Sequence, residues 1–474
     1  MSRKQQLLKR HRRNKRIALL IGLVLLLLTG VLVAWWLPLL LAVAAWLAHE
    51  AWFADHLFYS PKDDYDYQLN ADEQLSLQLV EGKLSPPGPL ALGDNDTLIL
   101  KVRIKSSWLG RLFDPGVRIL GGTADCQDFE RGVQGVRYLN LTGQQVALNE
   151  SRLALEGRFC RLDPGVELFI LRHPDYLAKR VLVVAPHADD AELAAFGLYS
   201  QAAQSWIVTL TAGEIEAEHY RQMGLDGVEA ARLKGSLRAW DSISVPLWAG
   251  VPQERCVQLG YFCLQLAAMQ AAPEQPVGSR EADMLDTRPF RRFNQLGLAS
   301  DANGIPSWQN LVQDLVELIE HIQPQVIVVP HPHFDPHPDH VCAQQAVLEA
   351  LGKTGSQPES LLYYANHLHD NDRWPMGQAG SGMALPPQLA AQSPLRPWAL
   401  TVLPQRQWHK AMSLGMMHDL QPPPPFKRKI RRLIQRCLAG RHWPAFGENE
   451  FFRKAVRQHE LFWVDENPSK REEV

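Results

Sequence analysis

The sequence has few cysteines, little net charge and no serine-hydrolase turn. Its six cysteines among 474 residues leave the redox compartment open. Cys126 with Cys160 and Cys256 with Cys263 are plausible disulfide partners, and reduced buried thiols are the alternative. A formal net charge of −2 without a broad basic field argues against a nucleic-acid-binding protein. Because no Gly-x-Ser-x-Gly turn occurs, a serine hydrolase is disfavoured.

Charged residues are missing altogether between Ile17 and Ala48. As one helix this segment would reach about 48 Å, beyond the ~30 Å hydrocarbon core of a bilayer. It must therefore tilt, bend at Pro38 or make two short passes. The segment far exceeds the usual apolar length of a cleavable signal peptide, which favours a retained membrane anchor.

The charges around this segment predict its orientation. The basic run Lys9–Arg16 precedes it, and Glu50 and Asp55 follow it. This bias places the amino terminus in the cytoplasm. We favour a single span through a bacterial inner membrane, which places the rest of the chain in the periplasm. If Pro38 instead turns a hairpin, the rest of the chain faces the cytoplasm.

We divide the chain into four parts. Residues 1–57 form the basic amino terminus and transmembrane anchor, and residues 58–178 a β-rich accessory domain. In the latter, Leu98, Leu100, Val102 and Ile104 alternate with less apolar positions, which predicts a small β-sandwich that binds glycan or acts as a spacer. The catalytic part is 179–421. Residues 422–474 comprise a Pro-rich connector, a basic amphipathic segment and a tail expected to be disordered.

Strand-like and helix-like periods alternate from Arg180 onward. Apolar runs at 181–185, 206–210 and 326–329 alternate with helical patterns near 230–240 and 311–322. This alternation predicts an α/β fold with a Rossmann-like parallel sheet and helices on both faces. Residues 251–308 interrupt it with Gly, Pro and charge, and are expected to form an insertion or substrate loop.

Two polar clusters follow two of these strands. The first contains His187, Asp189 and Asp190, and the second spans His331 to His340. Because ligands bind at the carboxyl ends of parallel strands, both clusters should face one crevice. Neutral imidazole and carboxylate are zinc ligands, and a catalytic site keeps one position open for water. Iron or manganese could occupy the same donors.

These clusters resemble the motifs of the PIG-L/LmbE-like zinc-dependent de-N-acetylases, which remove acetyl groups from N-acetylglucosamine-type sugars. The first motif reads His187-Ala-Asp-Asp190-Ala-Glu192, with Ala for Pro and one residue inserted before Glu. The second, His337-Pro-Asp-His340, is intact, and Thr211-Ala-Gly-Glu214 resembles the turn after the family's second strand.

The resemblance implies a role for each motif residue. His187, Asp190 and His340 would bind Zn²⁺, and Asp189 would be the general base. His337 would steady the oxyanion or protonate the departing amine, while Asp339 would orient a neighbouring imidazole.

The chain departs from the family pattern at two places. Arg232 is followed by Gly235 where the family often has Glu, and Cys263 stands where the family usually has Asp. Arg232 is therefore a candidate substrate contact, with a solvated helix charge as the alternative.

The sequence predicts a membrane-anchored, zinc-dependent N-acetylglucosaminyl-type deacetylase. Its partners would be the membrane and an N-acetylated glycolipid or surface polysaccharide, for example in lipopolysaccharide biosynthesis. One alternative is a metal-dependent amidase for a non-sugar amide. The other is a non-catalytic glycan-binding membrane protein. A shared fold does not fix the substrate.

Overall fold

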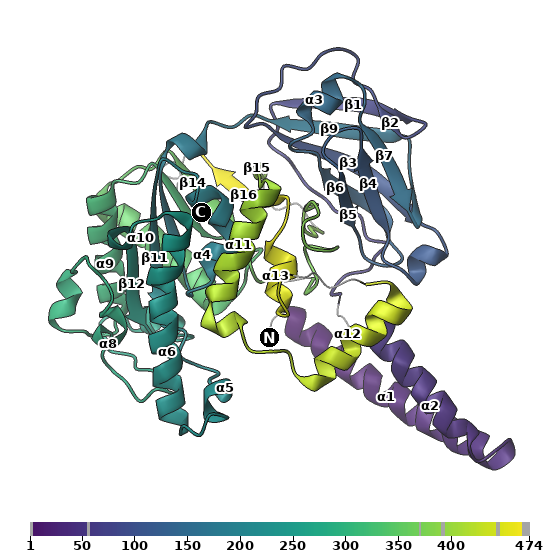
Figure 1. Cartoon of the computed structure of the whole chain (residues 1–474), viewed down its shortest axis with the longest axis horizontal. Helices are drawn as coiled ribbons and strands as arrows, with labels where there is room; N and C mark the ends of the chain where they lie inside the picture. Colours follow the sequence, from purple (N-terminus) through teal and green to yellow (C-terminus); the bar gives the residue numbers. More distant parts are fainter. Residues whose placement is uncertain (1–2, 55–56, 369–370, 390–393, 442–445, 467–474) are drawn as a thin grey trace.

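The computed structural model describes residues 3–54, 57–368, 371–389, 394–441 and 446–466. Three parts are visible in Figure 1: a helical hairpin at the amino terminus, a β-rich unit, and an α/β unit. The tail that was expected to be disordered lies outside the described residues from 467 onward.

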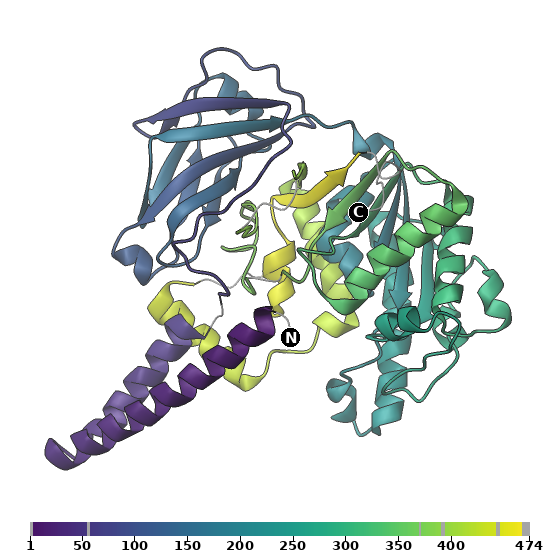
Figure 2. The ribbon, with the colours of Figure 1, turned by 180° about the vertical axis from the view of Figure 1, so that it is seen from behind.

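The amino-terminal part is a pair of antiparallel helices. It consists of α1 (Arg3–Leu32), α2 (Leu37–Ala48) and the π-helix η1 (His49–Phe53). At the tip, a Cβ on Gly30 would lie 3.0 Å from Pro38. At the base, Lys15 Nζ lies 3.3 Å from His49 Nε2. The helices lie side by side in both Figure 1 and Figure 2, and project from the body of the molecule.

The β-rich unit is one continuous antiparallel path of strands in the order β5-β4-β7-β2-β1-β9-β3-β6, with β8 paired to β3. Its elements are β1 (Glu73–Val80), β2 (Lys83–Leu84), β3 (Thr97–Ser106), η2 (Leu109–Arg111), β4 (Gly116–Leu120), β5 (Asp125–Asp128), β6 (Gln134–Asn140), α3 (Gln145–Asn149), β7 (Ala154–Arg158), β8 (Cys160–Leu162) and β9 (Gly165–Leu171).

The β-rich unit differs from the predicted two-sheet sandwich because its path nearly closes on itself. Gln127 in the end strand β5 reaches Asn140 in the other end strand, β6. The Gln127 side chain donates to Asn140 O at 2.6 Å and accepts from Asn140 N at 3.0 Å. The predicted alternation is seen in β3, where Leu98, Leu100 and Val102 are buried in the unit's own core.

The α/β unit is built on a seven-stranded sheet in the order β12-β11-β10-β13-β14-β16-β15. Its strands are β10 (Arg180–Ala185), β11 (Gln204–Thr211), β12 (Cys256–Tyr261), β13 (Val326–Pro330), β14 (Ser360–Tyr364), β15 (Pro397–Thr401) and β16 (His459–Asp465). Its helices are η3 (Tyr176–Ala178), α4 (Asp190–Tyr199), α5 (Glu218–Arg221), α6 (Gly227–Ser244), η4 (Val245–Ala249), η5 (Gln253–Arg255), α7 (Leu266–Ala271), α8 (Arg288–Arg291), η6 (Ala299–Ala302), α9 (Trp308–Ile322), α10 (Pro338–Thr354), α11 (Pro404–Met416), η7 (His418–Leu420), α12 (Phe426–Ala439) and α13 (Glu450–Ala455).

Strand residues alternate between two apolar cores. Leu182 and Val184 of β10 pack in one core with α9 and α10, whereas Val181 and Val183 pack in the other with α4. The strand β10 is therefore buried on both faces, which is why its sequence is a continuous apolar run.

The predicted Rossmann-like parallel sheet is wrong. The sheet is mixed, because β16 runs antiparallel to β14 and to β15. The strand β16 comes last in the chain but lies between those two strands. Burial pattern alone does not encode strand direction, and the sequence interpretation contained no strand at 459–465. The proposed insertion at 251–308 likewise contains a sheet strand, β12.

The β-rich unit packs directly on the α/β unit. Ile99 and Phe169 of the β-rich unit share a core with Ala399 and Trp463 of the mixed sheet. Thr97 Oγ1 accepts a hydrogen bond from Ala399 N at 2.9 Å. All six cysteines are free thiols, so none of the suggested disulfides is present.

Removing β16 should unfold the α/β unit. Its buried Leu461, Phe462 and Trp463 contribute roughly 5–9 kcal/mol if each is worth about 1.5–3 kcal/mol, which is comparable to a whole domain's stability. We expect a chain ending at Gln458 to lose its cooperative thermal unfolding transition by circular dichroism. A chain ending at Glu466, which retains all of β16, is the control and should keep that transition. An unchanged transition in the shorter chain would contradict this role for β16.

Candidate metal centre

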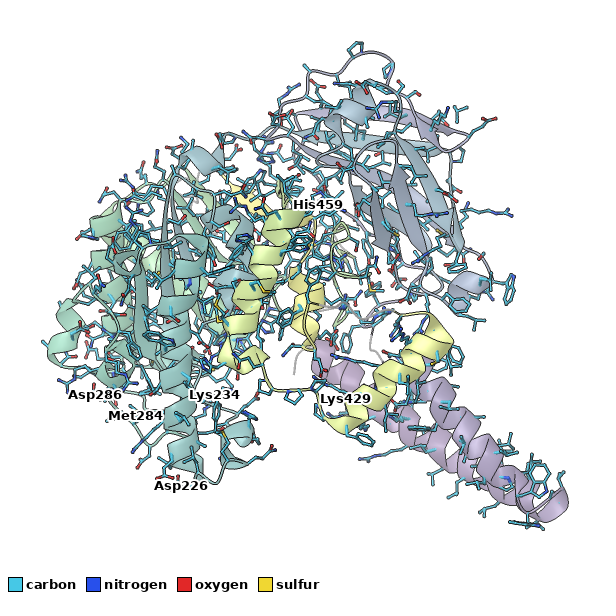
Figure 3. The ribbon with its side chains drawn as sticks, in the orientation of Figure 1. Asp226, Lys234, Met284, Asp286, Lys429 and His459 are labelled. Atoms are coloured by element: carbon cyan, nitrogen blue, oxygen red, sulfur yellow. The ribbon has the colours of Figure 1, made fainter. Side chains whose placement is uncertain are left out.

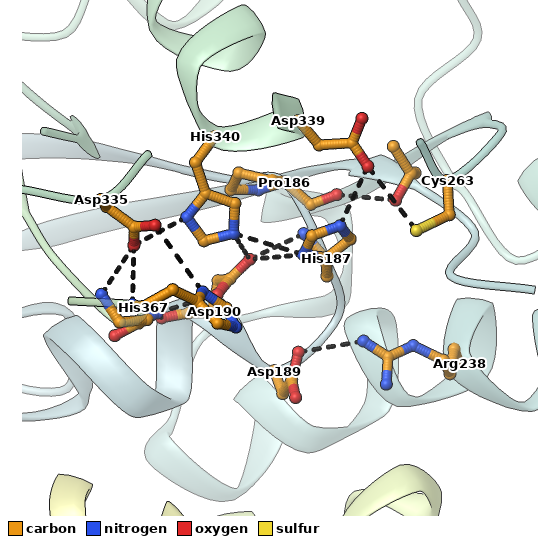
Figure 4. A network of polar contacts seen from close by, with 12 residues as sticks. Pro186, His187, Asp189, Asp190, Arg238, Cys263, Asp335, Asp339, His340 and His367 are labelled. Atoms are coloured by element: carbon orange, nitrogen blue, oxygen red, sulfur yellow. Dashed lines mark hydrogen bonds and ion pairs between the residues drawn. The ribbon is translucent and has the colours of Figure 1, made fainter. Parts of the chain in front are cut away.

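The two polar clusters of the sequence meet at one edge of the mixed sheet. Strands β10 and β13 are parallel neighbours, with Val183 opposite Val328. The first cluster follows β10 and leads into α4, and the second follows β13 and leads into α10. Because both strands end at the same edge, the side chains of both clusters converge there (Figure 4).

Three side chains from both clusters converge on one point. His187 Nδ1 lies 3.1 Å from Asp190 Oδ2, and His340 Nε2 lies 3.2 Å from the same oxygen. The two imidazole nitrogens are 3.3 Å apart. We call His187, Asp190 and His340 the donor triad. Two imidazole nitrogens and one carboxylate oxygen form a donor set that suits zinc.

Each imidazole of the donor triad has a second carboxylate on its other nitrogen. His187 Nε2 lies 3.2 Å from Asp339 Oδ2, and His340 Nδ1 lies 2.9 Å from Asp335 Oδ2. Leu264 N also donates to Asp339, at 2.7 Å. With protons on those outer nitrogens, His187 Nδ1 and His340 Nε2 keep their lone pairs for a cation.

The electrostatics of the triad also fit a cation. Burial lowers the pKa of His340, but the negative charges of Asp190 and Asp335 outweigh it and raise that pKa to about 9. Burial opposes the ionisation of Asp190, yet His340 and His187 hold its pKa well below the usual value. The pocket therefore stabilises positive charge between these groups, and a divalent metal would replace the imidazole protons.

His337 borders the triad. Its ring centroid lies 5.1 Å from that of His187 and 5.0 Å from that of His340. Its Nδ1 is buried and has no hydrogen-bond partner among the described residues. Burial and the neighbouring imidazoles lower the pKa of His337 to about 4. This nitrogen is thus available to a further ligand or to substrate.

The adjacent aspartates have different partners. Asp190 belongs to the triad and accepts from Asn366 Nδ2 at 2.8 Å. Asp189 instead accepts from Arg238 Nη2 at 2.9 Å, as Figure 4 shows. Arg238 is a buried α6 residue that the sequence interpretation missed. Gly213 leaves it room, because a Cβ there would lie 2.3 Å from Arg238 Nε.

Arg232, the predicted substrate contact, lies elsewhere on α6. It donates to the carbonyl oxygens of Ala282 and Asp283, at 2.8 and 2.9 Å. The Gly235 departure has a packing reason, since a Cβ at that position would lie 2.7 Å from the Phe290 ring.

Cys263, which stands where the family usually has Asp, lies close to the metal centre. The Cys263 thiol is buried 3.6 Å from Asp339 Oδ2. Asp335 and Asn366 are further site residues that the sequence interpretation did not assign a role. Asp335 lies within the second cluster, whereas Asn366 follows β14 without a local motif.

The comparisons with known proteins agree with this site. Residues 182–351 match the model of the PIG-L family, described as GlcNAc-PI de-N-acetylase. This part of the chain is a PIG-L domain. It contains His187, Asp190 and His340. The match confirms the predicted family, whose deacetylases are zinc-dependent, and with it the predicted zinc cofactor. It also supports de-N-acetylase activity.

Comparison with solved structures gives weaker likenesses. A triple mutant of a deacetylase from the teicoplanin biosynthetic pathway is 16% identical, covering 61% of this chain and 100% of its own, with a TM-score of 0.32. The zinc-inhibited form of teicoplanin deacetylase Orf2 has the same identity and coverage and a TM-score of 0.30. The 4-carboxy-2-hydroxymuconate hydratase GalB from Pseudomonas putida is 12% identical, covering 62% and 99%, with a TM-score of 0.33. No curated protein matches the chain.

Isosteric changes of the two adjacent aspartates should affect bound zinc differently. Asp190→Asn removes the charged oxygen that both imidazoles share, so we expect zinc content to fall severalfold or more. Asp189→Asn should keep zinc near the wild-type level, because Asp189 faces Arg238. Elemental analysis of the purified proteins measures the metal, and circular dichroism checks the fold. Equal loss from both variants would show that the ligand assignment is wrong.

Proposed function

We propose that this protein is a membrane-anchored, zinc-dependent deacetylase that removes the N-acetyl group from an amino sugar of the N-acetylglucosamine type. The substrate would be part of a glycolipid or a surface polysaccharide such as lipopolysaccharide. The observation that carries the proposal is the separation of the two adjacent aspartates. One completes a metal-donor triad, and the other stands beside it, held by Arg238.

The proposed chemistry divides between the metal and the protein. A zinc ion held by His187, Asp190 and His340 would activate water and polarise the acyl carbonyl. Asp189 would accept the water proton, with Arg238 fixing the direction of its carboxylate. His337 borders the same position and would hold the amide oxygen or pass a proton to the departing amine.

The alternatives are weakened by particular residues. A non-catalytic glycan-binding protein would not need the donor triad or its outer carboxylates, Asp335 and Asp339. Gly235, one of the two departures from the family pattern, has a packing reason. A metal-dependent amidase for a non-sugar amide uses the same centre, so substrate comparison must separate it from a sugar deacetylase.

Replacing Asp189 should abolish deacetylation without removing the metal. Loss of a general base costs about 10²–10⁴-fold in rate, and we expect Asp189→Asn to lose this much acetate release from an N-acetylglucosaminyl lipid. Arg238→Gln should also be slower, because Asp189 loses its partner. The matched control on the same helix, Arg232→Gln, should retain kcat within a fewfold.

The products identify the substrate class. In envelope glycolipids, cells with intact Asp189 should contain a species about 42 mass units lighter, since one acetyl is replaced by hydrogen. Faster hydrolysis of non-sugar amides than of N-acetylated sugars would instead establish the amidase. Zinc-loaded protein that binds sugar without releasing acetate would establish the glycan-binding alternative.

The amino-terminal hairpin supports membrane anchoring. Residues Arg12–Leu32 are long and apolar enough to cross a membrane, and Leu37–Phe53 is a shorter apolar helix. The uncharged part of α1, residues 17–32, is about 24 Å long. It ends at the tip beside Pro38, and the chain returns along α2 to His49, next to Lys15. The apolar segment therefore starts and ends at the same end of the hairpin, near Lys15 and His49.

We propose that this hairpin enters the bilayer from the cytoplasmic side and returns to it. The basic run 9–16 and the basic helix α12 both lie at the hairpin base, where Arg431 pairs with Glu50. Figure 3 shows α12, marked by Lys429, next to α1 and α2. Positive charge on this side favours the cytoplasmic face of the membrane. In this proposal the catalytic unit faces the cytoplasm, which was the alternative to a single span in the sequence analysis.

Paired reporters after Val474 should distinguish the two topologies. Alkaline phosphatase is active only outside the cytoplasm, and green fluorescent protein fluoresces only when it folds inside. For a hairpin we expect fluorescence without phosphatase activity. The opposite pattern would show that the segment 17–48 crosses the membrane once.

A further inference from the structure

A second cavity lies away from the metal centre, where the β-rich unit meets α12 and α13. Its volume is about 560 Å³. Its walls come from the rim of the β-rich unit, from residues 373–381 and from the two carboxyl-terminal helices. No residue of the donor triad lines it. We call it the arginine cavity.

The lining of this cavity is strongly positive. Eight arginines line it against three acidic residues, which leaves a formal charge of 8 − 3 = +5. The acidic groups are already engaged by arginines. Asp114 pairs with Arg373 at 2.6 Å and with Arg441 at 3.2 Å. Asp128 pairs with Arg158 at 2.8 Å. Two acidic residues outside the lining also pair with lining arginines, Glu156 with Arg118 and Glu50 with Arg431. With these counted the formal charge is 8 − 5 = +3, so the cavity remains positive.

Burial and repulsion from neighbouring arginines together lower the pKa of two arginines at this cavity. Burial, together with the charges of Arg373 and Arg441, lowers the pKa of Arg453. Burial and the charge of Arg453 lower the pKa of Arg457, behind it, to about 9. An anion in the cavity would relieve this repulsion.

The geometry of arginine favours a phosphate. Planar guanidinium groups bind phosphate through two parallel hydrogen bonds and remain charged at every physiological pH. A cavity of about 560 Å³ lies within the usual range for small-molecule sites. It has room for more than one phosphate group or for a phosphate with part of its carrier. Phe113 and Phe159, whose ring centroids are 5.4 Å apart, supply an apolar wall.

The cavity is connected to the membrane end of the molecule through α12. Arg428, Arg431 and Arg432 of this helix line the cavity. Arg431 also pairs with Glu50 in η1, and Trp52 of η1 donates to Leu112 O, beside the cavity wall. The cavity thus lies next to the hairpin base, where lipid phosphates would be found.

The helix α13 connects the cavity to the metal centre. Glu450 and Arg453 line the cavity. Between them in sequence, Phe451 faces the other way, with its ring centroid 6.1 Å from that of His367. His367 in turn lies beside His340, at 4.9 Å between ring centroids. Phe451 and His367 therefore form a line of ring contacts between this helix and the donor triad.

We propose that the arginine cavity binds a phosphate or diphosphate group, as carried by a lipid headgroup or by a free phosphorylated metabolite. This binding site is additional to the metal centre. It requires neither zinc nor hydrolysis, so it stands or fails independently of the proposed deacetylase. If the phosphate belongs to the sugar-bearing lipid itself, the cavity would hold that lipid next to the metal centre.

Calorimetric titration of the full-length protein in phosphatidylcholine nanodiscs tests this proposal. Inorganic pyrophosphate represents the free anion, and dihexanoyl phosphatidic acid represents a lipid phosphate. We expect saturable binding of at least one probe. The cavity variant Arg428→Gln/Arg432→Gln should weaken it by roughly tenfold or more, since it removes charged hydrogen-bond donors.

The control variant Lys427→Gln/Arg436→Gln removes the same charge from α12 at two exposed positions that do not line the cavity. It should bind within about twofold of wild type. Preference for phosphatidic acid assigns the site to a lipid headgroup, and preference for pyrophosphate assigns it to a free anion. Absence of binding by wild type, or equal weakening in both variants, would overturn the proposal. If the cavity variant misfolds, Arg428→Gln alone gives the same test at an exposed position.

Discussion

The parallel pairing of β10 with β13 is the constraint on which the catalytic geometry depends. These strands are separated by more than 140 residues of chain, yet their register brings both ends to one sheet edge. His187 and His340 can share one cation only because of this register. A shift by one residue would turn alternate side chains to the opposite face of the sheet. The two apolar cores, which take alternate residues of β10, hold the register fixed.

The metal centre and the arginine cavity carry charge imbalances of opposite sign. At the metal centre, carboxylates outnumber the cations that the protein itself supplies, so the site favours an added positive ion. In the arginine cavity the imbalance has the opposite sign. The helix α13 lines the arginine cavity and, through Phe451, contacts His367 beside the metal centre. This arrangement suits a substrate whose charged group and reacting amide are held by different parts of one protein.

The sequence predicted much of the metal centre because its residues are local to strand ends. The strands β10 and β13 are continuous apolar runs; the first motif begins two residues after β10, and the second cluster begins at His331, directly after β13. Arg238 could not be predicted in this way. It lies 49 residues from Asp189 along the chain, and a single arginine in a helix carries no local sign of its partner. Arg232, six residues earlier on the same helix, was the residue that the family pattern singled out.

The fold was less predictable than the site for a related reason. Apolar periodicity shows that a strand is buried but not which strand it pairs with or in which direction. The antiparallel strand β16 was therefore missed, and the near closure of the β-rich unit depends on a contact between Gln127 and Asn140. The sequence interpretation favoured a single membrane span over the hairpin, since the contact between Lys15 and His49 joins residues 34 positions apart and leaves no local sign in the sequence.

The position of β16 in the chain has a consequence for biogenesis. This strand is synthesised after every other strand of its sheet, although it occupies an interior position between β14 and β15. During translation the hairpin at residues 3–53 is synthesised well before β16, so the edge of β14 lacks its neighbour until that last strand is made. The mixed sheet therefore cannot complete its pairing until residues 459–465 have been synthesised.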